Sequence, residues 1–218
     1  MKSNEVLQKD VQDAIKWEPL LNAAEIGVTA KDGVITLTGS VDSYAKKSEA
    51  EDAAKNVIGV KAVVEKIEVH IGKWGKKDDN EIAAEILSAY KWNWEVPGDK
   101  VKVKVEDGWV TLAGELNWNY QKDAAKKSIT NLPGVRGVSN VITIKSEEHH
   151  EVEVLGIERA LERNWSTNGQ DIEVSISGHT VVLKGIVDSW YQKDVAGRIA
   201  WNAPGVWTVE NALVIEYN

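Results

Sequence analysis

The chain is 218 residues long, 43% hydrophobic and 28% charged, a balance that favours a soluble globular protein and disfavours disorder and membrane-spanning helices. Its 34 acidic residues outnumber the 26 basic ones, so we expect no nucleic-acid partner, because phosphate recognition requires a basic surface. The absence of cysteine excludes disulfides, thiolate nucleophiles and cysteine-ligated metal sites.

Three glycines mark an internal repeat. Gly39, Gly114 and Gly185 are each followed by another glycine 20 residues later. A fixed spacing that occurs three times indicates repeated units rather than one continuous domain. The predicted domains cover residues 1–73, 76–146 and 149–218.

Each repeat begins with a segment of helical periodicity. Its apolar residues recur three or four positions apart, which is the spacing of a helix with one buried face. The three stripes are Leu7, Val11, Ala14 and Ile15; Ile82, Ile86, Ala89 and Tyr90; and Val154, Ile157, Ala160 and Leu161.

The period then changes to two, which predicts a pair of half-buried strands. A tight turn separates the two strands, and each turn contains a glycine that permits the positive φ of a hairpin. The turns lie at residues 31–33, 106–108 and 177–178. The inward residues of the return strands are Ile35 and Leu37, Val110 and Leu112, and Val181 and Leu183.

A second helix and a last strand complete each repeat. We expect Asp42, Asn117 and Asp188 to cap the helices, because their short side chains can accept bonds from free helix amides. The predicted buried faces are rich in small residues: Ala50, Ala54 and Val57; Ala125, Ile129 and Leu132; Ala196, Ala200 and Ala203. The predicted last strands are Val63–Val69, Val138–Ile144 and Val209–Ile215.

The order α-β-β-α-β therefore predicts an α+β protein of three tandem units. One face of each strand is apolar and the other is polar, so we expect each unit to form a small three-stranded mixed sheet with both helices on one face.

This repeat resembles the BON family, named for bacterial OsmY and nodulation proteins. The resemblance rests on the strand motifs Gly33–Gly39, Gly108–Gly114 and Gly178–Gly185, the last of which is one residue longer. It also rests on a Gly-Val pair followed by Val-x-Asn, which occurs at Asn140 and Asn211, whereas the first copy has Glu65. It implies a small non-enzymatic module linked to osmotic or envelope stress and to phospholipid surfaces. A relative with a different second domain implies potassium binding as an alternative.

No residue pattern indicates catalysis, a cofactor or a metal centre. The phosphate-binding, dinucleotide, zinc-protease and nucleophile-elbow motifs are all absent. Ser43-x-x-Lys46 lacks the partner motifs of a Ser–Lys nucleophile and is better explained by a helix cap. His149 and His150 lie in an acidic segment that we interpret as a solvated linker.

Ten tryptophans and no phenylalanine make the aromatic composition unusual. We expect the tryptophans near the first-helix ends to close the cores; these are Trp17, Trp92, Trp94 and Trp165. A second group lies at the start of the second helices: Trp118, Tyr120, Trp190 and Tyr191. For this group two alternatives stay open, an exposed contact surface for protein or lipid and packing between neighbouring repeats.

Lys100, Lys102 and Lys104 alternate with valines and predict a basic row on one strand face. Three lysines attract an anionic leaflet only weakly, at about 1 kcal/mol each.

We therefore expect a non-enzymatic stress protein that binds phospholipid peripherally, with these lysines and the second aromatic group as candidate contacts. The alternatives are self-association through exposed aromatic patches and potassium sensing. The first residues contain no signal-like apolar run, so we expect a cytoplasmic location, or a periplasmic one if a leader was removed.

Overall fold

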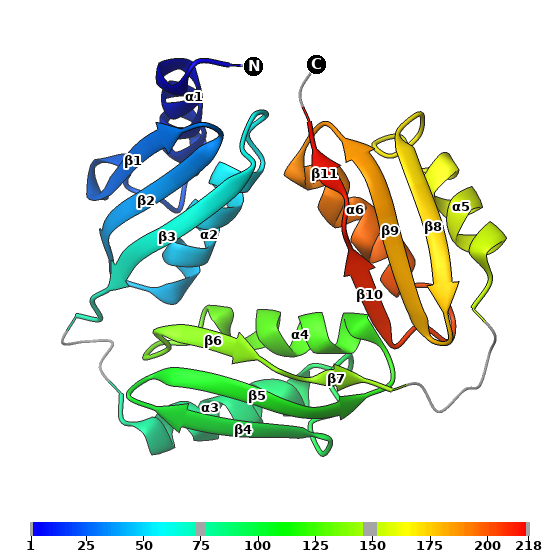
Figure 1. Ribbon diagram of the computed structural model, residues 1–218. Helices are drawn as coiled ribbons and strands as arrows, with labels where there is room; N and C mark the ends of the chain where they lie inside the picture. The colour runs from blue at the N-terminus through cyan, green and yellow to red at the C-terminus, as the bar shows by residue number, and fades with distance from the viewer. Residues whose placement is uncertain (1, 73–76, 146–151, 217–218) are drawn as a thin grey trace.

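The computed structural model describes residues 2–72, 77–145 and 152–216. They form three units with the same order of elements (Figure 1). The first unit contains α1 (Asn4–Trp17), a short 3-10 turn (Ala23–Glu25), β1 (Ile26–Lys31), β2 (Val34–Val41), α2 (Tyr44–Lys55) and β3 (Ala62–Val69). The second contains α3 (Asp79–Trp92), β4 (Val101–Glu106), β5 (Trp109–Leu116), α4 (Asn119–Thr130), β6 (Gly137–Asn140) and β7 (Thr143–Ile144). The third contains α5 (Val154–Arg163), β8 (Asp171–Ser177), β9 (Thr180–Val187), α6 (Trp190–Trp201), β10 (Thr208–Asn211) and β11 (Val214–Ile215).

Each unit has one mixed sheet with its two helices on the same face (Figure 1). The central strand pairs antiparallel with the strand before it and parallel with the strand after the second helix. The predicted α+β class and the three tandem units are therefore confirmed. The predicted domain boundaries fall in or beside stretches outside the described residues, and they stay predictions.

All three hairpins turn through two residues. Asp32 and Gly33 both have positive φ (53° and 84°), and Asp107 and Gly108 repeat this (49° and 77°). That pair of left-handed residues is the twist-compatible turn expected for Asp-Gly. In the third unit only Gly178 of the central pair has positive φ, so this turn is of another type.

The glycine that defines the repeat is required because two strands of the hairpin approach closely there. A Cβ on Gly39, Gly114 or Gly185 would lie 2.0, 2.2 or 1.8 Å from the carbonyl oxygen of Glu25, Lys100 or Asp171, at or just before the start of the neighbouring strand. All three residues also have positive φ. The repeated glycine thus serves the backbone and carries no chemistry.

Each unit has its own apolar core between its helices and its sheet. The predicted stripe of the first helix is buried at Leu7, Val11 and Ile15, and the other two units agree at Ile82, Ile86, Tyr90, Ile157 and Leu161. The small residues predicted for the second helices are also buried, for example Ala54, Ala125 and Ala200 at 0% exposure. Small side chains let these helices lie close to the sheet.

The prediction is wrong in two details, the position of the second-helix cap and the continuity of the last strand. The residue that caps each second helix lies one position later than expected, at Ser43, Trp118 and Ser189. The hydroxyls of Ser43 and Ser189 accept bonds from the amides three residues on, so the serines take the role assigned to the preceding acids.

The last strand is continuous only in the first unit. In the other two it is interrupted after Asn140 and Asn211, whose side-chain oxygens accept the amides of Ile142 (3.3 Å) and Leu213 (3.4 Å). Their amide nitrogens donate to carbonyls of the second helix at 2.9 and 2.7 Å. These asparagines therefore fix the loop to the helix. Glu65 also accepts the amide two residues on, and it pairs with Lys47 at 2.7 Å.

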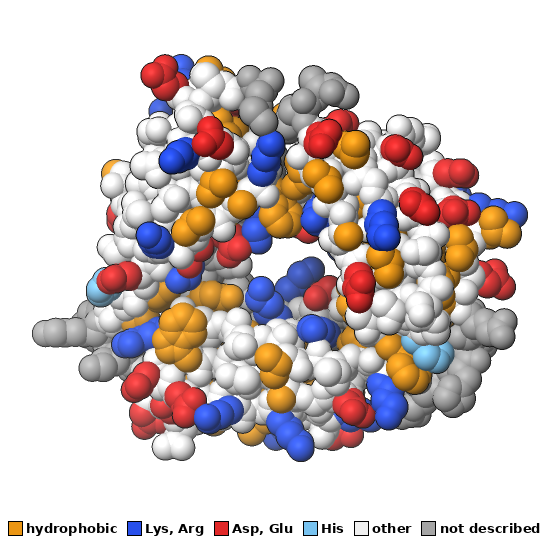
Figure 2. Space-filling model, in the orientation of Figure 1, with side chains coloured by type: hydrophobic (Ala, Val, Ile, Leu, Met, Phe, Trp, Pro, Cys, Tyr) orange, Lys and Arg blue, Asp and Glu red, His pale blue; other side chains and the backbone are white. Residues whose placement is uncertain are grey.

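The three units surround a central opening onto which the second helices face (Figures 1 and 2). Basic side chains gather on the rim of this opening (Figure 2). Within the described ranges no helix has the length and apolar character needed to cross a bilayer.

We predict that Gly114→Ala lowers the free energy of unfolding by about 2–4 kcal/mol, because the added methyl group meets the carbonyl of Lys100 and φ is left-handed. Urea unfolding measures this loss. Gly72→Ala is the control, since nothing lies within 4 Å of its added Cβ, and it should change stability by less than about 0.5 kcal/mol. Equal stability of the two variants would contradict the role given to the repeated glycine.

Candidate functional site

The first residue of a second helix reaches into the neighbouring unit. Tyr44, which begins α2, packs against the core of the second unit. Trp190, which begins α6, packs against the core of the first unit as well as its own. Burial is the main cause that raises the pKa of the Tyr44 hydroxyl, and a hydrogen bond with the backbone of Val138 in the second unit acts in the opposite direction.

The other end of a second helix makes the matching contact. Trp201, which ends α6, packs against the core of the second unit. Lys55, which ends α2, lies with its Nζ 5.8 Å from the ring centre of Trp190. The start of α2 thus lies near the end of α4, the start of α4 near the end of α6, and the start of α6 near the end of α2. We call these three contacts the seams.

Carboxylates and cations also face each other across the seams. Lys126 lies close enough to act on Asp52, Arg198 on Asp123, and Lys55 on Asp194. Desolvation is nevertheless the largest effect on each of these carboxyls, so the pKa of all three is raised. Desolvation likewise lowers the pKa of the Lys122 ammonium.

The structure separates the aromatic residues that were predicted as one contact group. Trp190 is half-buried in a seam, where its indole nitrogen has no hydrogen-bond partner among the described residues. Tyr120 and Tyr191 remain 44% and 40% exposed, and Trp118 is half-buried. Packing between repeats therefore accounts for Trp190, while the two tyrosines stay available for contacts.

The predicted basic row lies as expected on the outer face of an edge strand. Lys102 and Lys104 of β4 are exposed, and Lys100 is exposed just before it. The alternating Val101, Val103 and Val105 pack against the core of the unit. Lys104 pairs with Glu106 at 2.9 Å, although both side chains are more than two-thirds exposed, so this pair contributes little stability.

The prediction that the tryptophans near the first-helix ends close the cores is wrong. Trp17, Trp92, Trp94 and Trp165 are 84%, 87%, 87% and 81% exposed. Trp17 and Trp92 each lie two positions after the last buried residue of the helix, Ile15 and Tyr90. Two positions are about 200° of helical rotation, so the side chain points away from the core. The exposure of these two tryptophans could therefore have been predicted from their spacing in the sequence.

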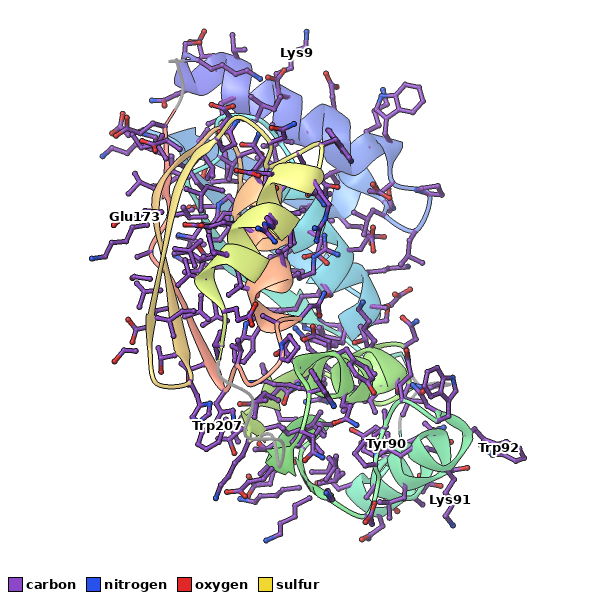
Figure 3. The ribbon with its side chains drawn as sticks, turned by 90° about the vertical axis from the view of Figure 1, so that its right-hand side faces the viewer. Lys9, Tyr90, Lys91, Trp92, Glu173 and Trp207 are labelled. Atoms are coloured by element: carbon purple, nitrogen blue, oxygen red, sulfur yellow. The ribbon has the colours of Figure 1, made fainter. Side chains whose placement is uncertain are left out.

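Three of these exposed tryptophans lie within two positions of a basic residue in the last turn of the first helix, and Trp94 lies three positions after Lys91. Lys16 precedes Trp17, Lys91 precedes Trp92, and Arg163 lies two positions before Trp165. All three basic residues are exposed. We call the four tryptophans and three basic residues the tips. In Figure 3, Trp92 stands at the outer right-hand edge, and α1 runs toward the same side.

The described residues offer no metal centre. No cluster of three histidine, aspartate or glutamate side chains among them could hold an ion. His179 stacks on Trp207 with ring centres 3.9 Å apart, and its Nδ1 lies 2.8 Å from the Gly205 carbonyl. Both features fit a structural role. His149 and His150 lie outside the described residues.

The BON domain model matches the chain three times, over residues 3–70, 78–146 and 156–217. The chain is a member of the BON domain family. The resemblance expected from the glycine motifs is thus confirmed for all three repeats.

Two curated relatives are similar over part of the chain. Osmotically-inducible protein Y of Escherichia coli (strain K12) is 33% identical over 129 residues, which are 57% of this chain and 64% of that protein. The 21 kDa hemolysin of Actinobacillus pleuropneumoniae is 32% identical over 142 residues, 64% of this chain and 73% of that protein. The chain thus spans less than two-thirds of the length of the first of these relatives.

Two solved structures of CdsD, a structural protein of the type III secretion system of Chlamydia trachomatis, also match. The C-terminal domain is 16% identical with a TM-score of 0.27 and full coverage of both chains. The other structure is 18% identical with a TM-score of 0.24, covering 97% of this chain and 92% of its own. Likeness at this level supports no statement about the present chain.

Removing the seam indole should loosen the assembly. We predict that Trp190→Ala lowers the free energy of unfolding by about 2–4 kcal/mol, because the cores of two units lose a packing partner. Small-angle scattering should also show a larger radius of gyration. The exposed Trp17→Ala is the matched control and should change neither quantity. An unchanged Trp190→Ala variant would show that the seam contributes nothing.

The carboxyl of Asp123 should make stability depend on pH. Its raised pKa means that the folded state binds this proton more readily than the unfolded state, so its ionisation lowers stability as pH rises. We predict that Asp123→Asn raises the melting temperature at about pH 7 and that the gain disappears as the pH falls below 3.8, the ordinary aspartate pKa, where the carboxyl is protonated in both the folded and the unfolded state. Melting curves across this range check it, with the exposed Asp99→Asn as control. A gain that stays constant with pH would contradict the assignment.

Proposed function

We propose that this protein is a non-enzymatic osmotic-stress protein that attaches peripherally to phospholipid membranes through its tips. The observation that carries the proposal is the exposure of the four tip tryptophans, at 81–87%, together with one exposed basic residue in each tip. The link to osmotic stress is extended from the Escherichia coli relative, osmotically-inducible protein Y.

Tryptophan exposed to this degree is unfavourable in water and favourable at a membrane. The indole combines a large apolar surface with one polar N–H, and such rings prefer the headgroup layer of a bilayer. An adjacent lysine or arginine adds about 1 kcal/mol near an anionic leaflet. A tip therefore has the composition of a shallow membrane anchor.

Because the tip occurs more than once, the weak membrane affinities of the single tips combine. One tip occurs in each unit, and the seams hold the units together. Once one tip has bound, the others are held close to the same surface, so their attachment becomes an intramolecular step. The basic row at Lys100, Lys102 and Lys104 and the exposed rings of Tyr120 and Tyr191 are further candidate contacts in this proposal.

We predict that alanine at all four tip tryptophans weakens binding to vesicles of anionic phospholipid by about tenfold or more. Co-sedimentation at low salt measures it. Trp109→Ala is the control, because this tryptophan is 55% exposed on a strand and belongs to no tip. Unchanged vesicle binding by the four-fold variant, or no binding by wild type, would overturn the proposal.

The same tryptophans also support self-association as a second candidate, because exposed aromatic patches are protein contact sites as well. Light scattering on the same samples separates the two. Growth of molar mass with concentration, abolished in the four-fold variant, would favour self-association over lipid. Potassium sensing stays a prediction, and higher melting in potassium than in sodium salts would support it.

A further inference from the structure

The seam between the second and third units lacks an aromatic residue that the other two seams contain. Tyr44, Asn119 and Trp190 are the first residues of α2, α4 and α6, and they hold the same position in the repeat. Tyr44 and Trp190 pack into the next unit. Asn119 is a smaller polar residue, so this seam is left without its aromatic side chain.

The receiving side of this seam also differs from its counterparts in sequence. Val138 lies beside Tyr44, and the residue that corresponds to it in the third unit is Val209. Asn119 and Val209, the counterparts of Tyr44 and Val138, both line one cleft. Gly197, also in its lining, replaces the Glu51 and Lys126 of the other copies and removes a side chain.

Two departures from the repeat thus coincide with a cleft of about 570 Å³ between α4 and α6. The indole of Trp201 and the phenol of Tyr191 contribute apolar surface to it. Gly197 is buried in α6, and a Cβ added to it would lie 3.0 Å from the side-chain nitrogen of Asn211, another residue of the lining, so a larger residue here would displace Asn211.

The charges of the cleft are balanced and not paired with each other. Lys122 and Arg198 supply two cations, and Asp123 and Asp194 supply two carboxylates. In the described part of the chain no ion pair within 4.0 Å joins any of these four side chains. Asn119 donates to Asp123 at 3.1 Å, which orients one carboxylate at the cleft.

We propose that this cleft binds a small zwitterion with a planar apolar group, of which a free aromatic amino acid is the simplest case. The ring takes the place that Tyr44 and Trp190 fill in the other seams. The carboxylate of the ligand meets Lys122 and Arg198, and its ammonium group meets Asp123 and Asp194. A neutral apolar ligand would leave these four charges unpaired, which is unfavourable where they are partly desolvated.

Because the cleft is shared by two units, a bound ligand also strengthens the seam. A ligand that binds only the folded state raises the melting temperature, and the stabilisation grows with the logarithm of the ligand concentration once this exceeds Kd. The four tip tryptophans do not line the cleft, although Tyr191 in its lining contacts the tip residue Trp165, with ring centres 6.1 Å apart. Binding of a ligand is measured without lipid, so its failure and the failure of membrane attachment are distinguishable.

Calorimetric titration of the full chain with L-tryptophan and L-tyrosine tests the proposal. Glycine is the zwitterion without a ring, and indole is the ring without charges. We expect both aromatic amino acids to bind at least tenfold more tightly than either fragment. No binding of the amino acids at millimolar concentration, or equal binding of indole, would overturn it.

A matched pair of variants locates the site. Asn119→Tyr restores the side chain of Tyr44 and should abolish binding while the melting temperature stays equal or rises. Asn80→Tyr is its control, because this exposed asparagine lies on α3 and does not line the cleft, and it should keep affinity within about threefold of wild type. Unchanged binding by Asn119→Tyr would place the ligand elsewhere and overturn the proposal.

A second pair of variants covers the case in which Asn119→Tyr fails to fold. Arg198→Gln removes a cation from the cleft and should weaken binding at least tenfold. Arg159→Gln is its control, because this exposed arginine lies on α5 and does not line the cleft. Equal losses from both, or no loss from Arg198→Gln, would reject the assigned site.

Discussion

The arrangement of this protein depends on one contact, the insertion of a residue at the start of a second helix into the neighbouring unit. The second helix can make this contact because its small residues pack one side of the helix closely against its own sheet. The residues at its two ends are then available to contact other units. Tyr44 and Trp190 then connect separate cores, and Trp201 returns the contact from the other end of a helix. A unit of about 70 residues buries only a modest core, so contacts between units supply stability that a single copy lacks.

The residues of the repeat fall into two classes, those shared by all copies and those that differ between copies. Glycines and small residues are shared by all three copies because the backbone approach they permit is needed in every unit. Residues at the seams differ between copies, since each seam joins a different pair of surfaces. Tyr44, Asn119 and Trp190 occupy one repeat position with three different side chains. Binding chemistry specific to this chain is therefore expected at the departures from the repeat, and not at the shared glycines, which carry the fold.

Much of the fold could be predicted from sequence, because local periodicity and turn chemistry determine it. The stripe of Leu7, Val11 and Ile15 and the Asp-Gly turns needed no knowledge of distant residues. The capping position was missed by one residue because Asp42 and Ser43 are both good caps and only the backbone decides between them. The exposure of Trp17 could have been derived from its angle relative to Ile15. The seams could not have been predicted in this way. Contacts between units depend on how the linkers orient the units, and the hydrophobic periodicity within one repeat contains no information on that orientation.

The tryptophans illustrate how the same residue type is used for opposite purposes. In the seams Trp190 and Trp201 are half-buried and hold units together, whereas at the tips Trp17, Trp92, Trp94 and Trp165 are exposed to water. The two uses are physically coupled. Freely moving units would present their tips independently, and each would then bind a surface with the weak affinity of one indole and one cation. Units fixed by their seams present all tips at set distances, which is the condition under which several weak contacts act as one strong attachment.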